Sequence, residues 1–150
     1  MPSHNCLSFP LIVCVYHGVK MKASCLCGSV EFTINSPFIS ANICHCSQCR
    51  KTHGGVGAAY GSCLKEDIDW GNSKKRIRRY ESSERGRRGF CKDCGSPIYY
   101  YHKDFPNHME ISLGVLDEEP NIASEYHLFV KSKPEWYGIH DDLPQYDELK

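Results

Sequence analysis

Apolar and polar residues alternate with a period of two along several short segments of the chain. In the segment SVEFTI, the apolar residues Val30, Phe32 and Ile34 are separated by single polar residues. The same alternation recurs at Met109, Ile111 and Leu113 of HMEISL and at Tyr126, Leu128 and Val130 of YHLFV. A period of two places every second side chain on one face of a β-strand. We therefore expect these apolar side chains to face the core of a β-sheet.

Two further segments contain the residue types of strands. They are VGAAY (residues 56–60) and SPIYYY (residues 96–101), and Gly or Pro residues flank them. Many short strands separated by turn residues predict an all-β domain. Helical content should be small, with one or two turns after Ser47 and the segment LKEDIDW (residues 64–70) as a second candidate.

The first 20 residues differ from the rest of the chain. The segment MKASCLCGSVEFTI, which begins at Met21, resembles a natural start. We expect a domain over residues 21–150, with residues 1–20 as a loosely attached extension; the alternative is an additional N-terminal strand. The most apolar run, residues 9–16, is short and contains a proline, and no basic segment precedes it, so we do not interpret it as a signal peptide. No run approaches the roughly 18 apolar residues that cross a bilayer, so we expect no membrane partner.

The composition suits one compact domain and argues against a nucleic-acid partner. Of the 150 residues, 41% are hydrophobic and 24% are charged. The 18 Lys and Arg residues balance the 18 Asp and Glu residues. A domain without net positive charge is a weak candidate for binding nucleic acid through its phosphates. Residues 74–88 are the exception, because they hold eight cations and only two acids.

Seven of the ten cysteines occur in tight clusters, which favours metal binding over disulfides. The clusters are Cys25 and Cys27, then Cys44, Cys46 and Cys49, then Cys91 and Cys94. Thiols separated by one or two residues are poor partners for long disulfide loops but good metal ligands. The isolated Cys6, Cys14 and Cys63 are expected to be ordinary thiols. Free thiols and zinc thiolates both indicate a reducing compartment, so we expect the protein in the cytoplasm.

Two of the clusters together supply the ligands of one closed zinc site. We expect Cys25 and Cys27 to share one face of a strand, since the side-chain period of a strand is two. The segment CKDCGS has the spacing of a zinc knuckle, with Gly95 after the turn. Four thiolates complete a tetrahedron, which is the arrangement of structural zinc sites.

The second cluster along the chain supplies only three thiols, at Cys44, Cys46 and Cys49. Three protein ligands with a fourth position open are typical of catalytic zinc sites. The alternative is that Cys63 or His53 completes the second tetrahedron. His45 lies between two of the cysteines and should point the other way along an extended segment. The spacing favours the open site.

The chain resembles the family of glutathione-dependent formaldehyde-activating enzymes, which also includes centromere protein V. Four segments carry the resemblance, which covers about residues 22–148: SCLCGSV, CHCSQCRK, FCKDCGS and LFVKSKPEWYGIHDDLPQYDE. The resemblance implies an all-β fold of small curled antiparallel sheets stapled by zinc, similar to a zinc-binding Rab exchange factor. It implies two zinc ions per chain, one structural and one catalytic. The implied structural ligands are Cys25, Cys27, Cys91 and Cys94, and the implied catalytic ligands are Cys44, Cys46 and Cys49.

The activity implied by the resemblance is that of a carbon–sulfur lyase. Its substrates would be glutathione, or a similar small thiol, and a small aldehyde such as formaldehyde, which condense to S-hydroxymethylglutathione. The characterised enzyme is longer than this chain, and its additional segments contribute to glutathione binding. Candidates for binding the thiol are Arg50, Lys51, Gly54, Gly55 and Gly57, with Arg85, Arg87 and Arg88 as further partners for its carboxylates. His53 is a candidate proton shuttle.

Two other interpretations compete with an enzyme. In the first, the domain is a non-catalytic, zinc-stapled binding module like centromere protein V, with residues 74–88 as its binding surface. In the second, it is a structural zinc protein in which both metal sites are closed.

Overall fold

The computed structural model of the 150-residue chain describes residues 19–120 and 122–150. Residues 1–18 lie outside the described part, and so does nearly all of the extension predicted for residues 1–20. The alternative of an additional N-terminal strand falls there too. The described residues are mostly strands and turns, so the predicted all-β fold is confirmed.

The smaller of two sheets has three antiparallel strands in the order β1-β2-β5. They are β1 (Met21–Ser24), β2 (Glu31–Ile34) and β5 (Ile68–Asp69). Met21 pairs with Ile34 and Ser24 with Glu31, so β1 and β2 form a hairpin. The turn of this hairpin carries the first cysteine pair.

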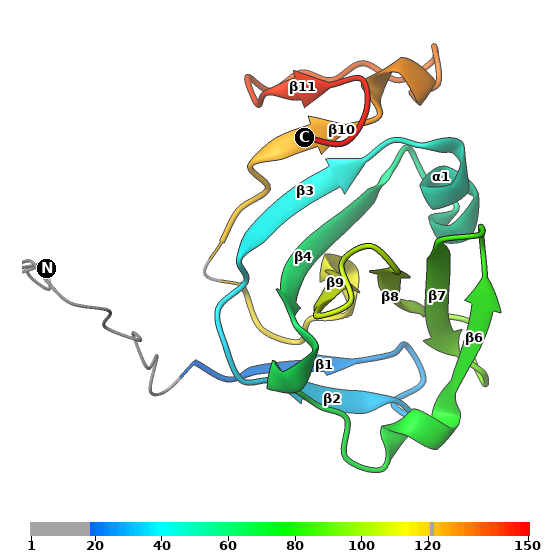
Figure 1. The fold of residues 1–150 in the computed structure, drawn as a ribbon, viewed down its shortest axis with the longest axis vertical. Helices are drawn as coiled ribbons and strands as arrows, with labels where there is room; N and C mark the ends of the chain where they lie inside the picture. The colour runs from blue at the N-terminus through cyan, green and yellow to red at the C-terminus, as the bar shows by residue number, and fades with distance from the viewer. Residues whose placement is uncertain (1–18, 121) are drawn as a thin grey trace, which may run out of the picture.

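The larger sheet has eight strands in the order β11-β10-β3-β4-β9-β8-β7-β6. Their bounds are β3 (Ser40–Cys44), β4 (Ala58–Leu64), β6 (Ile77–Glu81), β7 (Gly86–Cys91), β8 (Pro97–His102), β9 (His108–Ser112), β10 (Tyr126–Leu128) and β11 (Gln145–Tyr146). All neighbours are antiparallel except β10, which pairs in parallel with both β3 and β11. The sheet curls strongly, and β1 and β2 lie across one end of the curl (Figure 1).

The main hydrophobic core is made largely by the residues that the period of two selects. Val30, Ile34 and Ile111 are fully buried, and Phe32 and Met109 are nearly so. Burial of a side chain of this size stabilises the fold by about 1.5–3 kcal/mol. The core packs the small sheet against the large one and reaches the turns that carry the first and third cysteine clusters, since Cys25 and Cys91 belong to it.

The alternation predicted near residue 128 breaks down after β10. Leu128 is buried as expected, but His127 beside it is also buried, with 1% of its surface exposed. Phe129 has a left-handed backbone (φ 57°), which ends the strand, and Val130 begins a 3-10 turn, η4 (Val130–Ser132). Val130 is therefore not part of the strand face that its spacing predicted.

The described residues contain one α-helix, α1 (Ser47–His53), where one or two turns were predicted after Ser47. Three further 3-10 turns are η1 (Lys65–Asp67), η2 (Ser73–Arg76) and η3 (Leu113–Val115). The prediction of a helix over residues 64–70 was wrong. Only η1 is helical there, because Ile68 continues as strand β5 and pairs with Ile34 of β2. None of the described helices is long and apolar enough to cross a membrane.

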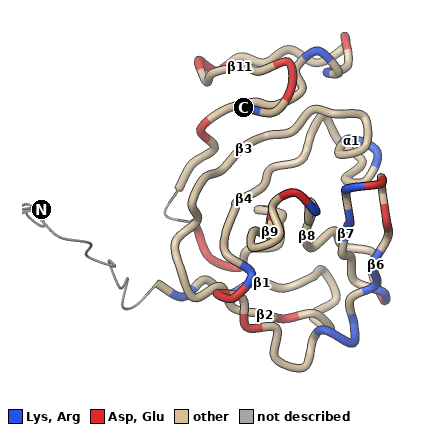
Figure 2. The backbone as a smooth tube through the Cα atoms, in the orientation of Figure 1, with Lys and Arg blue, Asp and Glu red and all other residues tan. Residues whose placement is uncertain are grey.

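The charges are unevenly distributed, as the sequence indicated. Lys and Arg residues gather along the edge strand β6 and the adjoining β7, whereas Asp and Glu residues recur in the C-terminal segment around β11 (Figure 2). Most of the cations in residues 74–88 are exposed. Arg88 is buried, with 5% of its surface exposed.

Candidate metal centres and the adjoining cavity

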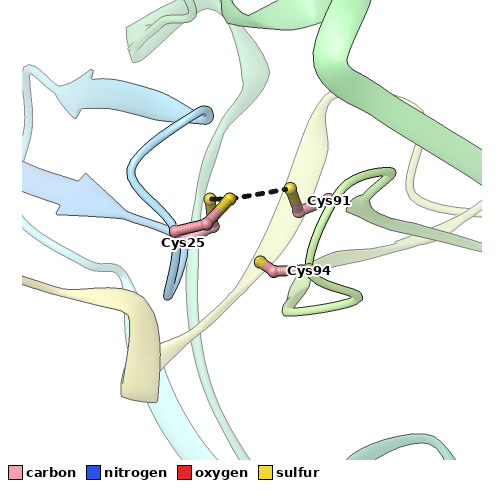
Figure 3. A group of neighbouring side chains, drawn as sticks. Cys25, Cys91 and Cys94 are labelled. Atoms are coloured by element: carbon pink, nitrogen blue, oxygen red, sulfur yellow. Dashed lines mark hydrogen bonds between the residues drawn. The ribbon is translucent and has the colours of Figure 1, made fainter.

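The first and third cysteine clusters meet between the turn of the β1–β2 hairpin and the turn after β7. Figure 3 shows Cys25, Cys91 and Cys94 directing their sulfur atoms toward a common point. The sulfur of Cys27 lies 3.6 Å from that of Cys25 and 3.9 Å from that of Cys91. A tetrahedral zinc ion with Zn–S bonds of about 2.3 Å requires sulfur atoms about 3.8 Å apart. The four thiols therefore fit one zinc ion. The sequence analysis expected Cys25 and Cys27 on a strand face, but they lie in the turn of the hairpin.

Two glycines with left-handed backbones shape these turns. Gly28 has φ 77° and donates its N–H to the carbonyl of Cys25 at 3.0 Å; Gly95 has φ 79° and donates to the carbonyl of Cys91 at 2.9 Å. Only glycine adopts this conformation without steric cost. Each turn thus brings the two thiols of its pair to the same side of the backbone.

The second cluster forms where strand β3 ends and helix α1 begins. Cys44 is the last residue of β3, Cys46 is the N-cap of α1, and Cys49 lies in its first turn. The sulfur of Cys46 accepts the backbone N–H of Cys49 at 3.3 Å, as an N-cap side chain does. All three sulfur atoms lie within 4.8 Å of one another. This strand-to-helix turn therefore presents three thiols to one point.

Among the described residues, no fourth His, Cys, Asp or Glu belongs to this group. Cys63, one alternative, is fully buried in the core on β4, and burial raises the pKa of its thiol to about 12. His53, the other alternative, contacts the hydroxyl of Tyr60 through its Nε2 at 3.0 Å. The described part of the chain thus offers three thiols and no further ligand.

All three cysteines of this cluster line a cavity of about 430 Å³ inside the curl of the large sheet. The same cavity is bounded by aromatic side chains and by a few charged groups. The aromatic residues are Tyr60, Tyr100, His102, Phe105, Tyr126 and Phe129, and the charged residues are Arg88, Glu110 and Lys150. A space of this size accommodates a small organic molecule beside the thiols.

Arg88 on β7 is a buried cation that contacts the three-cysteine cluster. Its Nη1 donates to Tyr60 Oη at 3.0 Å, and its Nη2 donates to Cys49 Sγ at 3.5 Å. Its guanidinium also lies over the ring of Tyr100, 4.8 Å from the centroid. Burial acts to lower the pKa of Arg88, but Tyr60 and Cys49 outweigh it and raise the pKa above its ordinary value. A permanent positive charge therefore stands against the three-cysteine cluster.

His53 does not line the cavity beside the three cysteines. It lines a second cavity of about 220 Å³ with Tyr60 and Arg88. Burial, together with the charge of Arg88, lowers the pKa of His53 to about 4. Since Tyr60 Oη accepts from Arg88, its own proton can be donated to Nε2 of a neutral His53. The candidate proton shuttle is thus separated from the cavity by Tyr60.

His45 points away from its neighbouring cysteines, as predicted from its position between them. Its Nδ1 lies 2.9 Å from the carbonyl of Val56, and its Nε2 lies 2.8 Å from Nδ1 of His127. Nε2 of His127 lies 3.0 Å from the carboxylate of Asp141. Carbonyl and carboxylate oxygens only accept, so all three hydrogen bonds form together when the two rings carry three N–H protons. This buried chain joins the three-cysteine turn to the C-terminal segment.

The other predicted thiol-binding residues lie elsewhere. Arg50 donates through Nε to the carbonyl of His45, and Gly54 caps the C-terminus of α1 with φ 65°. Lys51 and Gly55 are exposed. The structure does not bring these four residues to the cavity lining.

Three other candidates also have local roles. Arg85 and Arg87 pair with Asp104 and Glu81 at the surface. Gly57 is packed so closely that a Cβ would meet the carbonyl of Cys44 at 2.9 Å. Of the arginines considered for a carboxylate, only Arg88 lines the cavity.

A curled all-β fold with two groups of clustered thiols, one of them opening on a cavity, defines a class of small proteins suited to binding metal ions. The family model for glutathione-dependent formaldehyde-activating enzymes matches residues 20–132. The chain belongs to this family.

Three relatives support the assignment. A putative glutathione-dependent formaldehyde-activating enzyme of Halomonas elongata is 29% identical over 126 residues, covering 79% of this chain and 80% of the relative. An uncharacterized lyase of Schizosaccharomyces pombe is 25% identical over 122 residues, covering 80% of this chain and 85% of the relative. A putative enzyme of the same description from Penicillium rubens is 26% identical over 115 residues, covering 72% of this chain and 60% of the relative.

The fold has a match among crystal structures. A Rhodobacter sphaeroides protein superposes with a TM-score of 0.56 and 23% sequence identity, covering 67% of this chain and 92% of the other. This match shows the shared fold.

Proposed function

We propose that this protein is a zinc-dependent carbon–sulfur lyase that adds a small thiol to a small aldehyde, or releases it, at the three-cysteine site. The observation that carries the proposal is that three thiols without a fourth ligand among the described residues line a cavity beside a buried arginine. The names of the relatives support glutathione and formaldehyde as the substrates. Two zinc ions are proposed per chain, the other held by the four-cysteine cluster.

The proposed reaction forms one bond and moves one proton. The sulfur of the thiol attacks the carbonyl carbon, the electron pair of the C=O bond moves to oxygen, and that oxygen takes the proton that the thiol gives up. A bound zinc ion would lower the pKa of a thiol that completes its coordination, so that the thiol reacts as the thiolate. Cys44, Cys46 and Cys49 would hold the ion, and the walls of the cavity would hold both reactants in contact.

Arg88 has the position of an electrostatic partner for this chemistry. Its guanidinium compensates the negative charge of the thiolates through Cys49, and it is aligned before any reactant arrives by Tyr60 and Tyr100. A preorganised cation in a buried site stabilises charge that develops on a nearby oxygen more than it would in water. We assign Arg88 to stabilising the anionic reactants.

The test is the zinc content of the purified protein, measured with X-ray absorption at the zinc edge before and after reduced glutathione is added. We expect two zinc ions with fewer than four sulfur ligands each on average, and a gain of sulfur with glutathione. Exchange of ¹³C-formaldehyde into the adduct, followed by NMR, then measures turnover above the spontaneous rate. Two zinc ions with complete protein ligation that do not respond to glutathione would refute the proposal.

A binding module is the second candidate, and the exposed basic edge at β6 is the observation that favours it. Such a module would bind nucleic acid with a steep dependence on salt concentration. The three-cysteine cavity and Arg88 would have no role in it, so we place it second.

With its thiols reduced, the protein is proposed to work in the cytoplasm.

A further inference from the structure

Glu110 is a charged residue of the cavity for which the proposed reaction has no use. It lies on β9 and lines the cavity together with the three cysteines. Its Oε2 is shielded from solvent and has no hydrogen-bond partner among the described residues. Glu110 also forms no ion pair with them. A carboxylate oxygen left without a hydrogen-bond partner in a wall of this kind carries a considerable desolvation cost.

The surroundings of Glu110 favour a positively charged group on a bound ligand. Burial raises the pKa of its carboxyl, although a hydrogen bond with Ser62 and the nearby His108 act in the opposite direction. Lys150, a cation of the same cavity, lies with its Nζ over the ring of Tyr126 at 4.8 Å. A cationic group on a bound molecule would relieve the cost of ionising Glu110, because the charged form gains a partner.

The sheet register fixes where Glu110 lies relative to the thiols. Arg88 of β7 is paired with Tyr100 of β8, and Tyr100 is paired with Glu110 of β9. These three residues form a row across one face of the sheet, all lining the cavity. Neighbouring strands are about 4.8 Å apart, so the Cα of Glu110 is about 10 Å from that of Arg88. Arg88 in turn contacts Cys49, so Glu110 faces the same cavity as the metal-binding thiols, two strands away from the arginine that touches them.

We propose that Glu110 binds an ammonium group of the thiol substrate and so selects thiols that carry a free amine over those that do not. The γ-glutamyl ammonium of glutathione is of the required kind. This inference rests on the proposed function, because it assumes that a substrate thiol is placed at the three-cysteine site.

The experiment compares two thiols that differ only at the amine, glutathione and glutathione acetylated on its γ-glutamyl nitrogen. Their dissociation constants are measured by calorimetry on the full, zinc-loaded chain, with sulfur coordination followed at the zinc edge. We expect the wild type to bind glutathione about tenfold or more tightly than the acetylated thiol, as for loss of a charged hydrogen bond. Glu110→Gln should lose this preference. Glu66→Gln, which removes an exposed carboxylate from η1, should keep it.

The outcomes separate the two proposals. If both thiols coordinate to the wild type with equal affinity, or if Glu110→Gln keeps the preference, the role of Glu110 is refuted while the proposed function stands. If neither thiol binds to the zinc-loaded wild type, both proposals fail. Should Glu110→Gln not retain two zinc ions, the wild-type comparison of the two thiols still decides whether the amine is recognised.

Discussion

Arg88 and Cys49, 39 residues apart in the sequence, meet at 3.5 Å through a hydrogen bond from Nη2 to Sγ. Both side chains are buried, and Tyr60 contacts each of them. The contact links strand β7, which ends in the four-cysteine cluster at Cys91, to helix α1 of the three-cysteine cluster. Cys49 thus lies at the proposed reaction site, and Arg88 belongs to the strand that supplies Cys91, a proposed structural ligand.

Arg88→Met is expected to lower kcat/KM for adduct formation roughly 10–100-fold, since hydrogen bonds to charged groups are worth about 1.5–3 kcal/mol. The measurement is the rate of exchange between formaldehyde and its thiol adduct. Arg87→Met is the matched control, because Arg87 lies next in the chain but pairs with Glu81 at the surface. It should change the rate less than about twofold. Equal losses in the two variants, at unchanged zinc content, would contradict a role for the buried cation.

Substitution of single cysteines should separate the two clusters by what is lost. Cys49→Ser is expected to halve the zinc content while the protein stays folded, because its cluster lies beside a cavity. Cys91→Ser is expected to prevent stable folding, since its cluster ties the β1–β2 hairpin to β7 and structural zinc contributes more than about 10 kcal/mol, comparable to the whole stability of a domain. Metal analysis and thermal unfolding measure both effects.

The control for these substitutions is Cys63→Ala. Cys63 lies in the core and donates weakly to the carbonyl of Met109, away from both clusters. This variant should keep two zinc ions and lose roughly 1 kcal/mol of stability, as expected for deleting a small buried group. Loss of one zinc ion on this substitution would identify Cys63 as a ligand and contradict the open site.

The cysteine clusters could be predicted because their signal is local. Spacings of one or two residues already imply that Cys44, Cys46 and Cys49, or Cys91 and Cys94, reach one point. Counting the ligands of a tetrahedral zinc site also predicted that Cys25 and Cys27 share a site with Cys91 and Cys94. Their place in a hairpin turn did not follow, because a C-x-C spacing fits a strand face and a turn equally well.

The cavity could not be predicted, because its walls come from strands that are distant in the sequence. A period of two implies that Arg87 and Arg88 point in opposite directions, but it does not say which of them faces inward. That depends on the pairing of Arg88 with Tyr100 and of Tyr100 with Glu110. His127 was missed for the same reason, since its partner His45 lies 82 residues away.

His127→Leu tests the buried chain of rings behind the three-cysteine turn. The substitution leaves Nε2 of His45 without a partner in a fully buried position, which costs about 1–3 kcal/mol. We also expect the zinc ion of the three-cysteine site to bind about tenfold or more weakly, as when groups that orient metal ligands are removed. Denaturant unfolding and competition with a zinc chelator measure the two effects. His140→Leu, at an exposed position, should leave both unchanged, and equal behaviour of the two variants would contradict the prediction.

The low pKa of His53 predicts how stability depends on pH. Burial and Arg88 lower the pKa of His53 to about 4 from an ordinary value near 6.5, so between these values the unfolded chain binds a proton that the folded protein does not. Stability should therefore fall as the pH decreases from about 6.5 toward 4. Above about pH 6.5, His53 is neutral in both the folded and the unfolded state, so its protonation no longer changes the stability. His53→Gln retains a side-chain amide for Tyr60 but cannot titrate. Denaturant unfolding of both proteins at several pH values between 7 and 5 should show a smaller decrease for the variant. Protonation of the zinc-binding thiols also affects stability, but it affects both proteins alike, so parallel curves would show that His53 is not held neutral by its surroundings.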